Sequence, residues 1–384
     1  MKRLLSLAAA VACGPVAMAG PFAPPAGGEG STAVAADDAR FVEWAQSVEI
    51  VRGPVEITEP DGEVASYGSS ADAVGPADAT GWYPDPEVPE DPTPWQVVSL
   101  GDGGTATARF ARPVADGPGP DFAVFENSFN DTFLELAFVE VSSDGVHFAR
   151  FPATSLTPVG TQIFGGIDAT DIHNLAGKYR AGFGTPFDLA EIHDPRVNTA
   201  AVTHVRIVDV VGSIDPALAT RDADGRIVND PFTTPYESGG FDLDAVGVLH
   251  AAPGSWAEWS QFYFETADAD PAADPDRDGL PNRLEWALWT SPLVPGPAMS
   301  IRRNPSGAPM LVFRHDVGLR PGSLAVVTGC ADLASWAKLA EADAAGWHAI
   351  APGVETDLVE GAPDFIAISV PAAHRQFFQF NAAP

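Results

Sequence analysis

Residues 121–145 read DFAVFENSFNDTFLELAFVEVSSDG, and this stretch decides the fold class. Its first six residues form a short apolar run that suits a buried strand, and residues 133–142 form a second such run. The sequence Ser-Asp-Gly at 143–145 then gives a strong hairpin signal, after which residues 147–151 can return as the next strand. Since no long helical pattern separates these runs, the stretch predicts antiparallel β-structure.

Strand signals continue on both sides of this stretch. They lie at residues 97–100, 105–110, 202–210, 226–228 and 241–249. A succession of short strands favours a mainly β protein, with a large antiparallel β-sandwich (jelly-roll or galactose-binding-like) over residues 37–252. The 37 glycines and 36 prolines suit many turns better than a mostly helical fold. Near the start of this region, Phe41, Trp44 and Val48 recur at helical spacing and predict a short helix.

The first 36 residues indicate export. Residues 1–19 have the form of a signal peptide, with Lys2 and Arg3 ahead of an apolar stretch and an Ala-x-Ala cleavage site at the end. The alternative is a lipoprotein signal acylated on Cys13. Residues 20–36 are small and rich in proline and glycine, and we expect a flexible linker there. We therefore expect a secreted or cell-surface protein with no membrane span after signal cleavage.

The charge of the chain excludes two classes of partner. Lysine and arginine number 21 against 52 aspartates and glutamates, a formal net charge of -31. Binding to nucleic-acid phosphates or to an anionic membrane surface requires a basic face. The expected partners are therefore a glycan, a small-molecule ligand or a surface protein.

The strongest chemical motif is DPDRDGLPNRLE at residues 274–285. Counted as a twelve-residue loop, it has acids at positions 1, 3, 5 and 12, Gly279 at position 6 and Asn282 at position 9, the pattern of an EF-hand calcium loop. Calcium takes about six to eight oxygen ligands, and alternate carboxylates on a tight loop converge on one point. The predicted ligands are Asp274, Asp276, Asp278, the Leu280 carbonyl, Asn282 and Glu285. The alternative is an acidic solvated turn.

Tryptophans flank this loop on both sides. Trp256 and Trp259 precede it, and Trp286 and Trp289 follow it, at spacings that suit two short helices packed together. The sequence thus predicts a helix–calcium loop–helix connector over residues 253–292. Strand signals return after it and predict a small C-terminal β domain over residues 293–384. A single loop suggests a structural calcium site.

Two weaker sets of residues are candidates in the sandwich. Asp242 and Asp244 lie two apart on a strand and point the same way, and with Glu126 and Asn127 they form a candidate second metal or ligand site. The alternative is a set of rim acids that make turn hydrogen bonds. Exposed aromatic side chains on the loops are candidate ligand contacts: Trp82, Tyr83, Tyr179 and Tyr236. No nucleophile elbow is present, so we predict no catalytic residue.

The connector and the C-terminal region resemble a known pair of modules. Residues 256–292, with the pattern W…D-x-D-x-D-G-x-x-N-x-x-E-W-A-L…P, resemble the single calcium-loop connector of secreted proteins from Verrucomicrobia-like bacteria, akin to half a dockerin or a thrombospondin type 3 repeat. The segments APMLVFR (308–314), DLASW (332–336) and RQFF (375–378) resemble the β module that follows it. The resemblance implies an extracellular accessory module without catalysis.

The larger domain is similar to a family of bacterial cell-surface β-sandwich proteins that often carry PEP-CTERM-type sorting tags. The segments that carry the similarity are VSLGDGG (98–104), DFAVFENSF (121–129), ELAFVEVSSDG (135–145), NLAGKYR (174–180), GTPFDL (184–189) and SGGFDLDAV (238–246). The resemblance implies a place at the cell surface. Because some relatives look like auxiliary proteins of outer-membrane uptake systems, it also implies a corrinoid as one ligand.

Together these observations predict a non-catalytic secreted or cell-surface protein with a structural calcium site, which binds an extracellular glycan or a small ligand such as a corrinoid. One alternative is a structural surface or matrix component without a small ligand. The other is an extracellular polymer hydrolase, which needs a deep acidic cleft with a carboxylate pair of separated pKa values.

Overall fold

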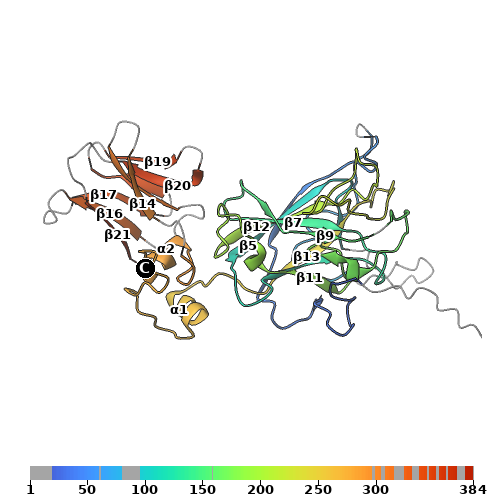
Figure 1. Ribbon diagram of the computed structural model, residues 1–384, viewed down its shortest axis with the longest axis horizontal. Coiled ribbons are helices and arrows are strands. Elements are labelled where there is room, and N and C mark those ends of the chain that lie inside the picture. Colours follow the sequence, from blue (N-terminus) through green and yellow to red (C-terminus); the bar gives the residue numbers. More distant parts are fainter. Residues whose placement is uncertain are drawn as a thin grey trace, which may run out of the picture.

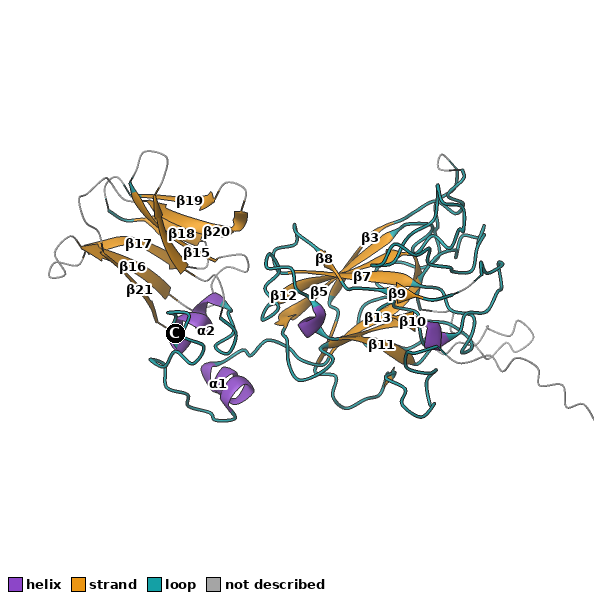
Figure 2. Cartoon of the chain, viewed as in Figure 1, coloured by secondary structure: helices purple, strands orange, loops and turns teal. Residues whose placement is uncertain are grey.

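The computed structural model describes most of the chain as a mainly β protein with antiparallel sheets and two α-helices (Figures 1 and 2). The described residues are 20–59, 62–79, 96–157, 159–295, 299–303, 308–314, 324–330, 337–343, 346–351, 354–359, 362–369 and 377–383. The mainly β, sandwich-like fold class predicted from the sequence is confirmed. The predicted signal peptide, Cys13, Trp82 and Tyr83 lie outside the described residues.

The large domain contains two antiparallel sheets and a short hairpin. The first sheet consists of β1 (Val34–Ala35), β11 (Phe183–Phe187), β6 (Phe122–Glu126), β13 (Asp242–Val248) and β2 (Glu43–Trp44), with β4 (Val98–Ser99) also paired to β13. The second consists of β3 (Ser47–Val51), β5 (Thr105–Val114), β12 (Val202–Asp209), β7 (Ala137–Ser142) and β8 (Ala149–Arg150). The hairpin is β9 (Thr154–Ser155) with β10 (Ile172–His173), and two 3-10 helices are η1 (Ala169–Asp171) and η2 (Leu189–Glu191).

Strand β6 shows why the apolar run of residues 122–125 is continuous. Phe122 and Val124 pack into the main core, which also contains side chains of the second sheet. Ala123 and Phe125 belong to a separate cluster on the opposite face of the strand. A strand covered on both faces needs apolar residues at every position, whereas a half-exposed strand alternates.

The segments that pack on the outer face of β6 differ from two predictions. The expected helix near residues 37–48 is absent, and β2 and β3 occupy this stretch instead. Phe41 and Trp44 lie with their ring centroids 5.7 and 5.5 Å from that of Phe125, so their apolar character serves a sheet face. Residues 20–36, expected as a flexible linker, also lie against the sandwich, because Val34 is buried and pairs with β11.

Strand β13 contains an irregularity that the sequence pattern did not reveal. The register with β6 shifts between Leu243 and Ala245. Leu243 packs into the main core before the shift, and Val246 and Val248 pack into it after the shift. Strict alternation had placed these valines on the same face as Asp242 and Asp244. The extra residue of a bulge reverses this relation, because it moves every later side chain to the other face.

The helices α1 (Trp256–Phe264) and α2 (Asn282–Leu288) follow, close to their predicted positions. The C-terminal strands form two four-stranded antiparallel sheets (Figure 2). The first sheet has the order β14 (Met299–Arg303), β15 (Pro309–Arg314), β20 (Ala362–Ser369) and β19 (Glu355–Val359). The second has the order β18 (Gly346–Ala349), β17 (Ala337–Asp343), β16 (Leu324–Cys330) and β21 (Phe377–Ala383). None of the helices in the described residues is long and apolar enough to cross a membrane.

Helix α2 joins the two β units. Leu280, Leu284 and Leu288 belong to the core of the C-terminal domain. Trp289, at the end of α2, instead packs with small side chains of the sandwich, and its carbonyl accepts a hydrogen bond from Asn198 Nδ2 at 2.8 Å. The connector therefore contacts both domains within a few residues of the predicted calcium loop, as the course of the chain in Figure 1 also shows.

Candidate functional site

The acidic loop before α2 is shaped by its own side chains. Asp274 accepts hydrogen bonds from the backbone N–H groups of Arg277 at 2.8 Å and Gly279 at 3.1 Å, and Asp276 accepts one from Asp278 at 3.1 Å. The backbone at Gly279 has φ of 99°, a left-handed conformation that favours glycine. These bonds close the loop tightly, and the side chains at its positions 1, 3 and 5, Asp274, Asp276 and Asp278, turn inward.

The carboxylates of the loop converge as the calcium motif predicts. Asp274, Asp276 and Asp278 each offer an oxygen, and these three oxygens lie within 4.8 Å of one another. Glu285 is fully buried, and neither of its carboxylate oxygens has a hydrogen-bond partner among the described residues. Burial, followed by the nearby Asp276, Asp278 and Asp274, raises the pKa of Glu285 to about 9. An acid buried beside three others without a donor is costly unless a cation joins them.

Two further oxygens are available at this centre. Asn282 donates through Nδ2 to the Asp270 carbonyl at 2.8 Å, which leaves its Oδ1 buried and without a partner. Leu280 is buried in the C-terminal core, which anchors the loop where the motif calls for a carbonyl ligand. The three aspartates, Glu285 and Asn282 Oδ1 therefore fit a hard cation with oxygen ligands, and the Leu280 carbonyl stays a predicted ligand.

The flanking tryptophans hold the two helices together. Trp259 is fully buried, with its ring centroid 4.9 Å from that of Trp256 and 6.4 Å from that of Trp286. Trp289 points to the sandwich instead. This aromatic cluster fixes the start of α2, on which Glu285 lies.

A second candidate site is a cavity of about 490 Å³ in the sandwich. Its lining is half aromatic or aliphatic and half polar. The apolar residues are Phe129, Phe133, Ile163, Phe164 and Tyr236, and the polar residues are Asn127, Glu135, Thr234, Glu237, Ser238 and Asp242. We refer to it as the sandwich pocket. Asn127 and Asp242, predicted as members of one site, thus line the same cavity as Tyr236, which was predicted as a separate ligand contact.

The acids at the sandwich pocket lie deep in the fold. Asp242 accepts hydrogen bonds from Asn127 Nδ2 at 3.2 Å and from the Ser99 hydroxyl, and burial raises its pKa to about 7. Glu126 is buried behind the lining, with Oε2 bonded to the Ser128 N–H at 2.9 Å and Oε1 without a partner. Burial, and then Asp242, raise the pKa of Glu126 well above its usual value.

Glu135 is a member of the pocket that the sequence analysis missed. It is 8% exposed, lines the cavity, and receives no hydrogen bond from any residue that the structure describes. Burial, followed by Asp242 and Glu126, raises its pKa well above the usual value. The run of residues 133–142 contains two acids, and because Glu140 forms ion pairs with Arg150 and Arg206, an acid in this run was not by itself a signal for the pocket.

Two other predicted residues do not reach the pocket lining. Asp244 accepts hydrogen bonds from the N–H groups of Asp78 at 3.2 Å and Ala79 at 3.3 Å, and so anchors the incoming loop. Tyr179 was expected to be exposed, and this is wrong: it is 1% exposed, and its hydroxyl bonds to the Thr32 hydroxyl at 2.8 Å. The cause is the packing of the N-terminal segment over the sandwich.

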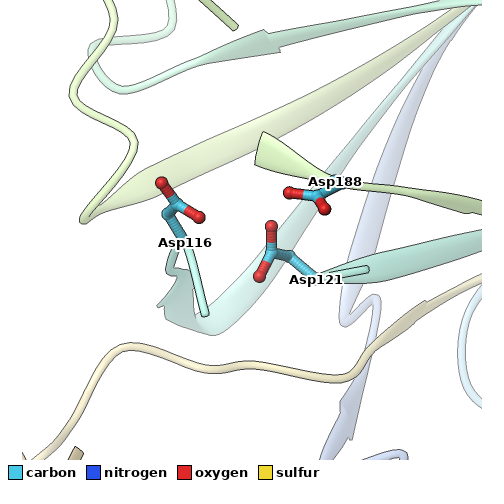
Figure 3. A group of neighbouring side chains, drawn as sticks. All are labelled: Asp116, Asp121 and Asp188. Atoms are coloured by element: carbon cyan, nitrogen blue, oxygen red, sulfur yellow. The ribbon is translucent and has the colours of Figure 1, made fainter. Parts of the chain in front are cut away.

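A third group of acids brings Asp116, Asp121 and Asp188 together (Figure 3). Asp121 is fully buried and is satisfied by a hydrogen bond with Nδ1 of His250 at 2.9 Å and by two backbone N–H groups, both at 2.7 Å. Burial and the two neighbouring aspartates raise the pKa of Asp116 to about 6. Because the Asp121 carboxylate already accepts these hydrogen bonds, the group has a structural role: it holds together a loop, η2 and the residues that follow β13.

Among the described residues, the two groups of three aspartates are the arrangements in which three ligand atoms of His, Cys, Asp or Glu lie within 4.8 Å of one another. Glu126, Asp242 and Asp244 do not form such a group. Asp242 and Glu126 therefore contribute to the polar base of the pocket, and Asp244 anchors a loop.

No known relative was found. No protein-family model, curated protein or solved structure matches the chain. The two resemblances drawn from sequence motifs therefore stay predictions, and the functional argument depends on the geometry of the two sites.

Proposed function

We propose that the chain is a non-catalytic, exported protein, secreted or held at the cell surface, in which one calcium ion stabilises the connector and the sandwich pocket binds a ligand. The observation that carries the calcium proposal is Glu285, a fully buried carboxylate without a donor that faces three aspartates. The signal-peptide pattern of residues 1–19 supports export.

The ligand atoms favour calcium over other metals. All side-chain candidates are oxygen donors, four carboxylates and one amide, with neither histidine nor cysteine among them. Zinc and copper prefer nitrogen and sulfur ligands, while magnesium demands a smaller octahedral shell and keeps several waters. A loop that supplies several carboxylates and a carbonyl suits the larger calcium ion.

The test of this site is isothermal titration of calcium into residues 20–384. We expect one equivalent to bind, and we expect Asp276→Asn to abolish the binding. Asp268→Asn, at an exposed position of the same acidic connector, is the matched control and should bind as the wild type does. Equal calcium binding by Asp276→Asn and the wild type would refute the assignment.

The sandwich pocket supports the ligand-binding half of the proposal. Its volume of about 490 Å³ lies in the usual range for small-molecule sites, and apolar walls with a few convergent polar groups are their usual lining. The proposed ligand is a glycan or another small molecule such as a corrinoid. Titration with soluble glycans and cyanocobalamin tests it, with Phe164→Ala as the variant expected to lose binding.

A second candidate function is hydrolysis of an extracellular polymer. One observation favours it, since Glu135 and Asp242 line the same pocket and both have raised pKa values. A hydrolase of this kind needs one protonated and one ionised carboxylate on either side of the bond that breaks. Release of reducing sugar from polysaccharides, lost in Glu135→Gln, would establish it, and its absence across a broad panel would remove it.

A further inference from the structure

The lining of the sandwich pocket is strongly one-sided in charge. Glu135, Glu237 and Asp242 all line it, whereas the described lining residues include no lysine, arginine or histidine. A concave, partly desolvated surface with charges of one sign focuses its field and attracts ions of the other sign. The pocket is therefore suited to a cation.

Further acids behind the lining strengthen this field. Glu126, Asp209 and Asp230 are buried and act electrostatically on Glu135. Arg52 acts on Asp242, but its guanidinium already donates to the carbonyls of Tyr67 and Ser99, at 2.7 and 2.6 Å. The described residues thus supply little positive charge to offset these acids when they ionise.

Glu135 is the residue that points most directly to a bound ligand. More than nine-tenths of its surface is buried, it lines the cavity, and no described residue donates to its carboxylate. An acid buried in this way is costly to ionise, and it gains free energy as a carboxylate when a donor or a cation reaches it. The cavity is the side from which such a group can come.

The apolar part of the pocket lining is largely aromatic. The rings of Phe129 and Phe133 are stacked with centroids 4.8 Å apart, and Phe164 lies 6.0 Å from Phe133. Phe129, Phe164 and Tyr236 are 51%, 69% and 48% exposed, which is high for such side chains. Aromatic faces attract organic cations through the ring quadrupole and also contact their apolar parts.

The geometry distinguishes this ligand from a metal ion and from a neutral sugar. Among the described residues, the pocket acids do not form a group of three close ligand atoms such as the calcium loop provides. A neutral hydroxyl can donate to Glu135, but it leaves the repulsion between the acids unchanged. An ammonium group donates to the carboxylates, neutralises part of their charge, and can carry an apolar body against the rings.

We propose that the sandwich pocket is a binding site for a small organic ammonium ion, with its charged head toward Glu135 and Asp242 and its apolar body against Phe129, Phe164 and Tyr236. This inference rests on the proposed role of the pocket as the ligand site. It specifies the chemical class of the ligand, and it is independent of the calcium loop.

The test compares charged probes with neutral ones of the same shape. Calcium-loaded residues 20–384 are titrated calorimetrically with choline and with benzylammonium, and in parallel with 3,3-dimethylbutan-1-ol and benzyl alcohol. We expect each ammonium ion to bind at least about ten-fold more tightly than its neutral counterpart, a difference of about 1.4 kcal/mol.

Variants locate the binding. Glu135→Gln keeps the shape of the side chain and should weaken the ammonium ions at least ten-fold with little effect on the alcohols. Phe164→Ala, at a 69% exposed position, should weaken all four compounds without unfolding the protein. Glu63→Gln, on an exposed loop outside the lining, is the control for the loss of one acid. Thermal unfolding of each variant checks that it is folded.

Each other outcome overturns the inference in a different way. If the alcohols bind as tightly as the ammonium ions and Phe164→Ala weakens both, the pocket is a ligand site without preference for cations. If none of the four compounds binds, the inference fails, while the ligand-binding role of the pocket is decided by the separate titration with glycans and cyanocobalamin. If a second calcium equivalent binds and is lost in Glu135→Gln, the occupant is a metal ion.

Discussion

At the residue scale, two acids dominate the chemistry of this chain. Glu285 in the connector and Glu135 in the sandwich are both largely buried, and neither carboxylate receives a hydrogen bond from a described residue. Acids in this position destabilise the fold unless a ligand compensates them, so each is informative about a partner. Each acid lowers the stability of the ligand-free protein and contributes to ligand binding. A substitution can separate these two effects.

Glu285→Gln should therefore stabilise the calcium-free protein and abolish the effect of calcium. A pKa of about 9 means that Glu285 must take up a proton on folding at pH 7, a cost of up to about 3 kcal/mol that glutamine does not have. We expect a higher melting temperature than the wild type in chelator, and no further increase with calcium. Differential scanning calorimetry measures both, with the exposed Glu29→Gln as the control. A lower melting temperature in chelator would contradict the structure.

Asp102 gives a pH dependence that is separate from both sites. It is buried and bonded to the Ile57 N–H at 2.7 Å, and burial is the main cause that raises its pKa from 3.8 to about 6. The folded state holds the proton more tightly than the unfolded state, so its contribution is present below pH 4 and is lost as the pH rises to 6. At about 1.4 kcal/mol per pH unit, this loss is about 3 kcal/mol.

Asp102→Asn should remove this loss, because asparagine can accept the same hydrogen bond without titrating. Relative to the wild type, the free energy of unfolding of the variant should improve by about 3 kcal/mol between pH 4 and pH 7. Urea denaturation at both pH values, in chelator, measures the change. A difference that is independent of pH would show that Asp102 does not hold its proton in the folded state.

The sequence predicted a site more completely when its residues lie close together along the chain. All the loop ligands lie within residues 274–285, so their spacing alone predicts that they converge. The pocket brings together residues from Asn127 to Asp242, which only the sheet pairing places side by side. Asn127, Asp242 and Tyr236 could be named from local features, but Glu135 could not be assigned to them without the fold.

At the element scale, β13 and α2 position the two sites. The bulge in β13 lets Leu243 and Val246 share the main core although an odd and an even position would normally face opposite sides. Asp242 precedes the bulge and lines the pocket, and the rest of the strand, including Asp244, is buried. Apolar runs predicted the strands well. A bulge leaves no reliable mark in residue type, however, so strict alternation placed Val246 and Val248 on the wrong face of the strand.

The N-terminal strands show the opposite limitation. Phe41 and Trp44 have helical spacing, yet they pack on Phe125 of another strand. Short segments carry too few residues to separate the two periods, and tertiary contacts then decide. Longer-range pairing is also why β1 and β11 went unpredicted, since neither has a strong local signal.

Helix α2 is held by its apolar face, and its stability can be tested there. Leu284 is 3% exposed within the C-terminal core. Leu284→Ala should lower the free energy of unfolding of that domain by about 2–5 kcal/mol and weaken calcium binding, because Glu285 would lose its fixed position. Leu293→Ala, at a 52% exposed position nearby, should change it by less than about 0.5 kcal/mol. Equal effects of the two variants in urea denaturation would contradict this packing.

At the scale of the whole molecule, the chain is two β units with separate cores, joined by the connector. The overall organisation followed from the sequence, because the strand signals stop at the connector and resume after it. The contacts that join the units could not be predicted from the sequence. Asn198 and Trp289 are 91 residues apart, and neither residue indicates an interface by itself. Calcium beside this contact would fix the two ends of the molecule relative to each other.

The most direct measurement is calorimetric unfolding of residues 20–384 in calcium and in chelator. Two cores predict two transitions, and Leu284→Ala identifies the one that belongs to the C-terminal unit. We expect calcium to raise the C-terminal transition by several degrees and to leave the sandwich transition nearly unchanged. Identical traces in calcium and in chelator would contradict the account, since the buried acid at Glu285 would then have no ion to compensate it.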